Sequence, residues 1–147
     1  MVLRDHRGEV IVAACRTLTQ CVDATDSELC AIEEGLRLSM HWTDMKLTAE
    51  TDCAEAVELI KESTPNTSVY AFRISAIREL LRERETKIAR ISRDANVVGH
   101  VLARFGRVQA RTEVWLRSFP QEITEAVTMT VTLSLLNIFF FSLQKKK

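Results

Sequence analysis

Asp52 stands where the sequence changes from the period of a strand to the period of a helix. In "LTAETDCAEAVELI" the apolar residues before Asp52 alternate with polar ones, whereas after Cys53 they recur at helical spacing. A carboxylate at such a junction either caps the helix that follows or holds a ligand at the end of the strand. The residues alone leave both roles open.

The cysteines and histidines do not have the spacing of a metal site. No two cysteines form a C-x-x-C pair, and the histidines lie far from them in the sequence. We therefore expect neither a zinc site nor a disulfide framework. The residues concerned are Cys15, Cys21, Cys30, Cys53, His6, His41 and His100.

The start of the chain, "MVLRDHRGEV", does not have the pattern of a secretory signal, because the charged residues of "RDHR" interrupt the apolar stretch that such a signal needs. Together with the unpaired cysteines, this predicts an intracellular protein in a reducing compartment, cytoplasmic or nuclear and not secreted.

The composition is that of one globular domain without a strongly basic surface. The chain has 147 residues, of which 46% are hydrophobic and 27% are charged. Lys plus Arg and Asp plus Glu both count 20, and without the three terminal lysines 17 basic residues face 20 acidic ones, a net charge of −3. A strong overall field for binding polyanions is therefore not expected.

Apolar periodicity predicts an alternation of strands and helices. Two strands joined by a tight turn at residues 5–8 open the chain, and a helix follows with Asp26 or Ser27 as its N-cap. A strand over residues 45–50, two helices, the strand "TKIARIS" and the helix "RDANVVGHVLARFGRVQAR" come next. The order β-β-α-β-α-α-β-α predicts an α/β fold with a mixed, partly parallel sheet and helices on its faces.

The same periodicity predicts the buried face of three of these helices. The residues expected to face the core are Leu29, Ile32, Leu36 and Met40 in the first helix, Val69, Phe72, Ala76 and Leu80 in the third, and Val98, Val101, Leu102 and Phe105 in the last.

The last part of the chain has a different character. Residues 126–143, "AVTMTVTLSLLNIFFFSL", are 18 residues without a charge, and lysines follow. Their number reaches the lower limit of a membrane span, but in the first half Thr and Ser alternate with apolar residues, which is the period of a strand. Three interpretations stay open: a segment packed on the domain, an extra strand, and the least favoured, a membrane anchor.

Four segments, in this order, resemble the ribonuclease H-like domain, type 1, of plant retroelement-derived, reverse-transcriptase-associated proteins. They are "VLRDHRGEVIVAACR", "ELCAIEEGLRLS", "LTAETDCAEAVELI" and "ISRDANVVGHVLARFGR", the last followed by "VWLRSFP". The resemblance covers residues 1–127 and leaves an apolar tail, residues 128–147, that ends in lysines. It implies a ribonuclease H-like mixed sheet with flanking helices.

The resemblance also implies a hydrolase. In that family, carboxylates hold Mg²⁺ or Mn²⁺ at the scissile phosphate, and water cleaves the RNA strand of an RNA–DNA hybrid. Glu28, in the first turn of its helix, and Asp52 match the family's metal-binding carboxylates. His100 falls where catalytic members have aspartate or histidine, and is the implied catalytic helper. Arg93 and Asn96 resemble the family's "R-x-x-N" and are the implied contacts to the nucleic acid.

One element of the family is not found in this sequence. The family's first aspartate lies on a central strand before the hairpin, and that strand pairs with the hairpin on one side and with the strand that ends at Asp52 on the other. We therefore expect an N-terminally truncated domain with an opened sheet and an incomplete set of ligands. The period-two pattern of the tail suggests a strand for this opening, and the opening or the tail is a place for self-association or for a partner.

Two functions follow from the resemblance. The first is Mg²⁺-dependent hydrolysis of RNA in RNA–DNA hybrids. The alternative is a catalytically inactive retroelement-derived remnant that at most binds nucleic acid weakly. In both, the expected partner is a hybrid or another nucleic acid rather than a membrane.

Overall fold

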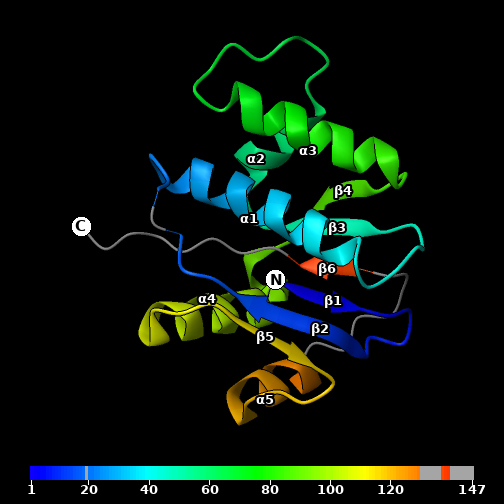
Figure 1. Ribbon diagram of the computed structural model, residues 1–147, viewed down its shortest axis with the longest axis vertical. Coiled ribbons are helices and arrows are strands. Elements are labelled where there is room, and N and C mark those ends of the chain that lie inside the picture. Colours follow the sequence, from blue (N-terminus) through cyan, green and yellow to red (C-terminus); the bar gives the residue numbers. More distant parts are fainter. Residues whose placement is uncertain (19, 130–136, 140–147) are drawn as a thin grey trace.

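The elements follow the predicted order, with three more on the C-terminal side. A computed structural model describes residues 1–18, 20–129 and 137–139 (Figure 1). The strands are β1 (Val2–Arg4), β2 (Val10–Cys15), β3 (Thr48–Thr51), β4 (Lys87–Arg90), β5 (Glu113–Leu116) and β6 (Asn137–Phe139). The helices are α1 (Ala24–Ser39), α2 (Ala54–Lys61), α3 (Ala71–Glu83), the short 3-10 helix η1 (Arg93–Ala95), α4 (Val97–Gln109) and α5 (Gln121–Met129).

The described strands form one mixed sheet in the order β4-β3-β6-β1-β2-β5. β1 and β2 form the predicted antiparallel hairpin, in which Gly8 supplies a positive φ of 81°. β3 and β4 are parallel, and α2 and α3 connect them across one face. The predicted α/β fold with a mixed, partly parallel sheet is confirmed.

The C-terminal strand fills the place where an opening in the sheet was expected. β6, red in Figure 1, lies between β1 and β3, antiparallel to the first and parallel to the second. Ile138 pairs with Leu3 of β1 and with Ala49 of β3. The expectation of an opened sheet is therefore wrong, and the suggestion that the tail supplies a strand is confirmed. A strand at this place pairs with the backbone edges of both neighbours, which would otherwise be exposed.

The rest of the tail is described only in part. α5 ends at Met129, so the proposed domain boundary between residues 127 and 128 falls within this helix. Residues 130–136 and 140–147 lie outside the described residues, and so does most of the segment considered as a membrane anchor. Among the residues that the structure describes, no helix is long and apolar enough to cross a membrane.

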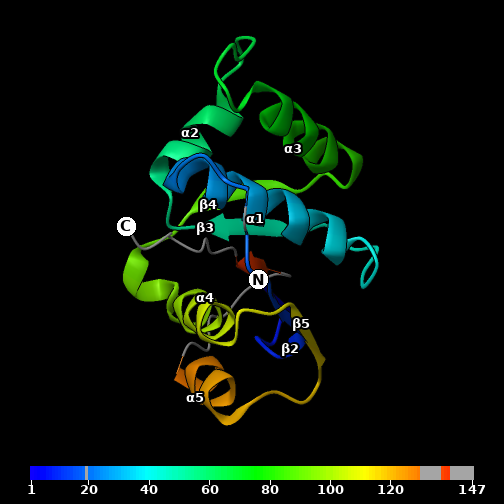
Figure 2. The same cartoon turned by 60° about the vertical axis from the view of Figure 1, so that its left-hand side comes forward.

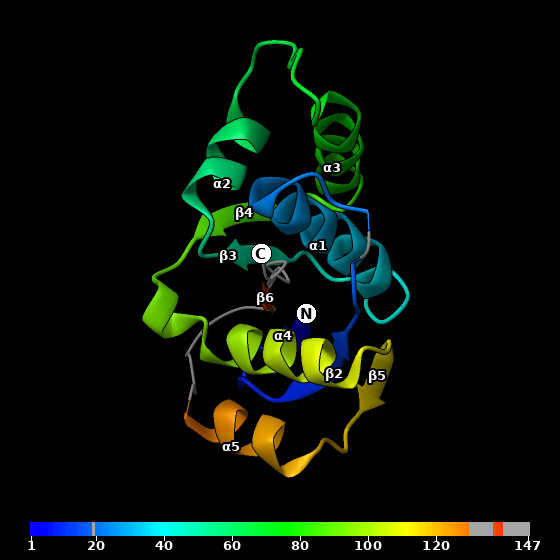
Figure 3. The same cartoon turned by 90° about the vertical axis from the view of Figure 1, so that its left-hand side faces the viewer.

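The helices gather in two groups around the sheet. α1, α2 and α3 contact one another and lie on the side of β3 and β4, whereas α4 and α5 lie on the side of β2 and β5 (Figures 1 and 3). Figure 2 shows α4 and α5 side by side. One hydrophobic core joins the two groups through the fully buried Val2, Leu3 and Val12 of the hairpin. This arrangement brings the C-terminal end of β3 close to the N-terminal end of α4.

The buried face of α3 differs from the predicted one. α3 buries Ile74, Ile77 and Leu80, whereas Val69 and Phe72, expected in the core, are 82% and 89% exposed. The helix begins two residues after Val69, so the predicted stripe started outside the helix, and its first half had the wrong phase; Leu80 is buried as predicted. For α1 and α4 the faces agree better: the core contains Leu29, Ile32, Leu36, Val98 and Leu102.

The cap of α1 also differs from the prediction. The N-cap is Asp23, whose carboxylate accepts a hydrogen bond from the backbone N–H of Asp26 at 2.8 Å. Asp26, expected as the cap, lies in the first turn and pairs with Arg73 of α3 at 3.0 Å. α1 therefore begins earlier than the apolar pattern indicates.

Candidate active site around Asp52

Asp52 is not the cap of α2. The N-cap is Cys53, whose Sγ accepts a hydrogen bond from the backbone N–H of Ala56 at 3.4 Å. The Asp52 side chain, 15% exposed, turns instead toward α4: its Oδ1 accepts a hydrogen bond from Nδ2 of Asn96 at 3.2 Å, and its Oδ2 lies 3.3 Å from Nε2 of His100. Of the two roles left open by the sequence, the capping role is thus taken by another residue.

Glu28 reaches the same place from α1. Its Oε2 accepts a hydrogen bond from the hydroxyl of Thr51 at 3.3 Å, and Thr51 is fully buried at the end of β3. The same hydroxyl oxygen accepts a hydrogen bond from the backbone N–H of Cys53 at 3.2 Å. One buried hydroxyl therefore connects the carboxylate of α1 to the turn that carries Asp52.

The start of α4 holds Asp52 from the other side. Asn96 occupies the N-cap position of α4 and is 1% exposed. Gly99 leaves room for it, because a Cβ at this position would lie 2.2 Å from Oδ1 of Asn96. The resemblance implies a contact of Asn96 with nucleic acid; in the structure its buried side chain contacts Asp52 and positions that carboxylate.

His100 follows Asn96 by one turn of α4, and its side chain is 40% exposed. The approach of its Nε2 to Asp52 does not have the geometry of a hydrogen bond. The contact is electrostatic, and it is attractive when the imidazole is protonated.

Glu28, Asp52 and His100 line one pocket of about 570 Å³, whereas Asn96 and Thr51 support it from behind. In Figure 3 the end of β3, the start of α2 and the segment leading into α4 come together on the left of the molecule. The acidic and basic side chains that line this Asp52 pocket are Glu28, Asp52, Glu55, His100, Arg93, Arg104 and Arg107.

The predicted site residues therefore meet, and two arginines join them that the sequence did not single out. Arg104 follows His100 by four residues, and Arg107 follows Arg104 by three. These spacings place all three side chains on one side of α4. The spacing is visible in the sequence. Only the orientation of the helix on the sheet shows that this side faces the pocket.

The pocket has a negative potential near α2. Burial raises the pKa of the Cys53 thiol, and the carboxylates of Glu28, Glu55 and Asp52 raise it further, while the bond from Ala56 opposes them. The thiol therefore stays neutral in its capping role, and the surrounding charge favours a cation.

Glu28 and Asp52 are the pocket side chains whose chemistry suits a Mg²⁺ ion. Glu28 and Asp52 offer the oxygen ligands that Mg²⁺ prefers, and proteins commonly hold this ion by one or two carboxylates together with a substrate phosphate and water. Within the described residues, no group of three or more His, Cys, Asp or Glu side chains is arranged to hold a metal ion. No Asp or Glu follows Glu125 in the sequence, so β6 brings no further carboxylate.

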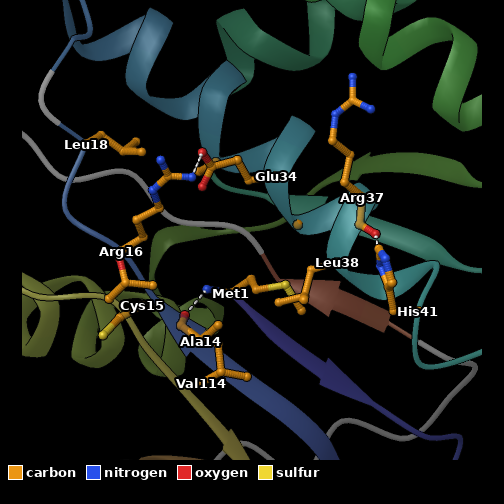
Figure 4. Close-up of a pocket in the computed structure, with 13 residues that line it drawn as sticks. Met1, Ala14, Cys15, Arg16, Leu18, Glu34, Arg37, Leu38, His41 and Val114 are labelled. Carbon is orange, nitrogen blue, oxygen red and sulfur yellow. Dashed lines mark hydrogen bonds and ion pairs between the residues drawn. The ribbon is translucent and has the colours of Figure 1, made fainter.

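A second cavity, of about 380 Å³, lies between α1 and the ends of β2 and β5 (Figure 4). Apolar side chains such as Met1, Leu38 and Val114 line it. Glu34 is the one acidic side chain among its described lining residues, and it pairs with Arg16 at 2.6 Å. The exposed Arg16 and Arg37 also line this cavity, but both pair with glutamates, and the cavity lacks the several carboxylates found around Asp52.

The model of the reverse transcriptase-like family matches residues 1–106 of the chain. The chain belongs to this family, and it is a ribonuclease H-like domain. No curated protein and no solved structure matches it.

The family match contains most of the Asp52 pocket of this ribonuclease H-like domain but not all of its sheet. It ends at Gly106, so β5, α5 and β6 lie outside it, as does Arg107. The strand that completes the sheet next to Asp52 therefore comes from a part of the chain that the family model does not match.

Proposed function

We propose that this ribonuclease H-like domain binds RNA–DNA hybrids at the Asp52 pocket and hydrolyses the RNA strand with Mg²⁺ or Mn²⁺. One observation supports the proposal above all: carboxylates from α1 and from the end of β3, a histidine from α4 and three arginines line the same pocket. Carboxylates hold a cation and arginines neutralise a phosphate, and hydrolysis of a phosphodiester uses both.

Glu28 and Asp52 are the residues that would hold the metal ion. An Mg²⁺ ion held by these two carboxylates would supply Lewis-acid chemistry, which lowers the pKa of a bound water and compensates negative charge on a phosphate oxygen. The chain orients both ligands in advance, because Asn96 donates to Oδ1 of Asp52 and Thr51 donates to Oε2 of Glu28. Such supporting hydrogen bonds fix the direction of a ligand before substrate binds.

His100 is placed to move a proton. Its imidazole lines the pocket and is partly open to solvent, while the Nε2 atom is buried beside Oδ2 of Asp52. A group in this position accepts a proton from the attacking water or returns one to the leaving oxygen, and exchanges it with solvent. We assign His100 this helper role rather than that of a metal ligand.

The hybrid would be recognised mainly through its backbone. Arg93 is exposed just before α4 and lines the pocket, where its guanidinium can pair with a phosphate. A hybrid has an A-like shape with 2′-hydroxyls in a shallow groove, and its recognition relies on shape and backbone contacts. A local arginine cluster on a chain of net charge 0 suits this mode of binding.

A second candidate function is hybrid binding without cleavage. No Asp or Glu follows Glu125, so β6 adds no carboxylate to the pocket. Only Glu28 and Asp52 of the pocket match metal-binding carboxylates of the family, which uses a larger set, and this supports the second candidate. A site with fewer carboxylates holds fewer metal ions and stabilises less charge in the transition state. The retroelement-derived remnant considered from the sequence corresponds to this candidate.

The test is cleavage of a labelled RNA–DNA hybrid by the purified chain in Mg²⁺ or Mn²⁺. The Asp52→Asn variant keeps the shape of the side chain and removes its charge, so we expect it to lose cleavage. Asp44→Asn is the matched control, because the Asp44 side chain is fully exposed and lies outside the Asp52 pocket. It should cleave like the wild type.

The outcomes separate the two candidates. Cleavage that is lost in Asp52→Asn and kept in Asp44→Asn supports hydrolysis at this pocket. A folded wild type that binds the hybrid but does not cleave it supports the second candidate. Equal cleavage by wild type and Asp52→Asn contradicts the assignment of the site.

A further inference from the structure

We propose that Arg104 and Arg107 form a phosphate track that leads from the Asp52 pocket along α4 and binds the sugar-phosphate backbone next to the phosphate in the pocket. The inference rests on the proposed function, which places a nucleic acid at that pocket. It adds two residues and a direction for the bound strand.

The spacing of the track matches a nucleic-acid backbone. His100, Arg104 and Arg107 lie on one side of α4, and at about 1.5 Å per residue the distance from the first to the last along the helix is about 10 Å. One strand of a duplex carries a phosphate about every 3.4 Å of helix axis. Neighbouring phosphates of one strand lie farther apart than this axial rise, so the track is long enough to reach from the phosphate at the pocket to its neighbour on the same strand.

The packing of α4 fixes the direction in which the track faces. The opposite side of the helix is buried through Val98, Leu102 and Gly106. At Gly106 the helix lies close to β2, because a Cβ there would be 3.1 Å from Cβ of Cys15. α4 is thus held against the sheet, and Arg104 and Arg107 remain exposed.

No carboxylate of the described residues neutralises the two arginines. Within the described residues neither forms an ion pair, whereas Arg73 is held by carboxylates of α1. Glu122 and Glu125 of α5 line an adjoining hollow together with Arg104, but not within ion-pair distance. An exposed guanidinium without a protein partner is available to a phosphate oxygen.

The experiment measures how the affinity for a duplex depends on salt. A hybrid and a DNA duplex of the same sequence are titrated without divalent metal between about 50 and 200 mM salt, where each phosphate contact contributes about 0.9 to the slope of log K against log salt. We expect R104Q/R107Q to lower the slope by about 2 for both duplexes. The matched control is K61Q/R82Q, which removes two exposed charges from the ends of α2 and α3 and should keep the wild-type slope.

Each outcome bears on one claim. An unchanged slope in R104Q/R107Q, or an equal fall in both double variants, overturns the track. A wild type that cleaves hybrids while R104Q/R107Q keeps the wild-type slope overturns the track and leaves the proposed function standing. If R104Q/R107Q lowers the slope but the wild type does not cleave hybrids, the track is supported and the proposed hydrolysis is contradicted. A wild type that binds neither duplex, with or without Mg²⁺, overturns both.

Discussion

Asn96 connects the start of α4 to the carboxylate at the end of β3. Its amide donates to Asp52, its side chain is buried, and the missing side chain of Gly99 leaves the space that it occupies. A buried polar contact of this kind orients a ligand only as long as the space around it is kept. The geometry of the pocket thus depends on a glycine that does not line it.

Gly99→Ala tests this dependence. The new Cβ would lie 2.2 Å from Oδ1 and 2.8 Å from Cγ of Asn96, so the amide has to leave Asp52. We expect a loss of about 1–3 kcal/mol in the free energy of unfolding, as for other overpacked sites, measured by urea denaturation.

A double-mutant cycle isolates the cause of that loss. In an Asn96→Ala background the clash is absent, so Gly99→Ala should cost much less there than in the wild type. The same cost in both backgrounds would contradict the contact with Asn96 as the reason.

Asp23 gives a prediction about pH. The backbone N–H of Asp26 and the hydroxyl of Tyr70 donate to its carboxylate and lower its pKa below the ordinary 3.8. The hydrogen bond from the Tyr70 hydroxyl to Asp23 also raises the pKa of Tyr70 to about 12. Because the folded state then binds fewer protons than the unfolded state, the stability from Asp23 is present above the ordinary pKa and is lost as the pH falls through the lowered value.

Asp23→Ala should therefore lower the urea midpoint at neutral pH, and the difference from the wild type should shrink below about pH 4. Asp44→Ala, at a fully exposed carboxylate that caps no helix, is the control and should change little. The same difference between wild type and Asp23→Ala at neutral and at strongly acidic pH would argue against this explanation.

The resemblance seen in the sequence could indicate the carboxylates that line the pocket but not what supports them. Asp52 is visible at a junction of strand and helix, yet the cap is Cys53, a residue type that is not a usual N-cap. Arg104 has the right spacing from His100, but the buried face of α4 decides whether that side meets the pocket. Contacts between residues far apart in the chain are needed for both conclusions.

At the scale of elements, β6 is the strand on which the sheet depends. It lies between the hairpin and the parallel pair and is the only described strand that joins β1 to β3. Without it the sheet would separate into a β1–β2–β5 part and a β3–β4 part. The end of β3 carries Asp52, so this strand also bears on the position of the pocket.

Ile138→Pro tests the role of β6. Proline removes a backbone donor from a strand that is paired on both sides. We expect a loss of about 1–3 kcal/mol, the usual cost of a buried backbone group without a partner, measured by urea unfolding. Ile138→Val keeps the donor and the strand propensity and is the control.

Hydrogen exchange locates the effect. In Ile138→Pro the amides of β1 and β3 should lose protection, whereas those of α3 should keep theirs. Unchanged stability and protection in the proline variant would contradict a central position of β6.

The sequence predicted the order of the elements better than their partners. Alternation and helical spacing located β1 to β4, α1 and α4, because these signals are local. The phase of α3 failed, since Val69 lies before the helix and Phe72 in its first turn faces solvent. The position of β6 depends on two pairings with strands more than 80 residues away, and local periodicity suggests such a strand without showing where it pairs.

At the scale of the whole molecule, neither sign of charge is in excess, but charged side chains cluster locally. The chain has equal numbers of acidic and basic residues, but the Asp52 pocket brings two family-type carboxylates together with three arginines. In the absence of a cation, Glu28 and Asp52 repel a phosphate that Arg93 and the phosphate track attract. Binding of metal and of nucleic acid should therefore favour each other, as linkage requires.

The measurement that tests this account most directly is the affinity for an uncleavable RNA–DNA hybrid. It is measured with and without Mg²⁺ for the wild type and for Asp52→Asn. The account predicts that Mg²⁺ strengthens binding several-fold in the wild type only. It also predicts that Asp52→Asn without Mg²⁺ binds at least as tightly as the wild type, because a repelling charge has been removed. An equal response to Mg²⁺ in both proteins would show that metal and nucleic acid do not meet at Asp52, and would contradict the proposed site.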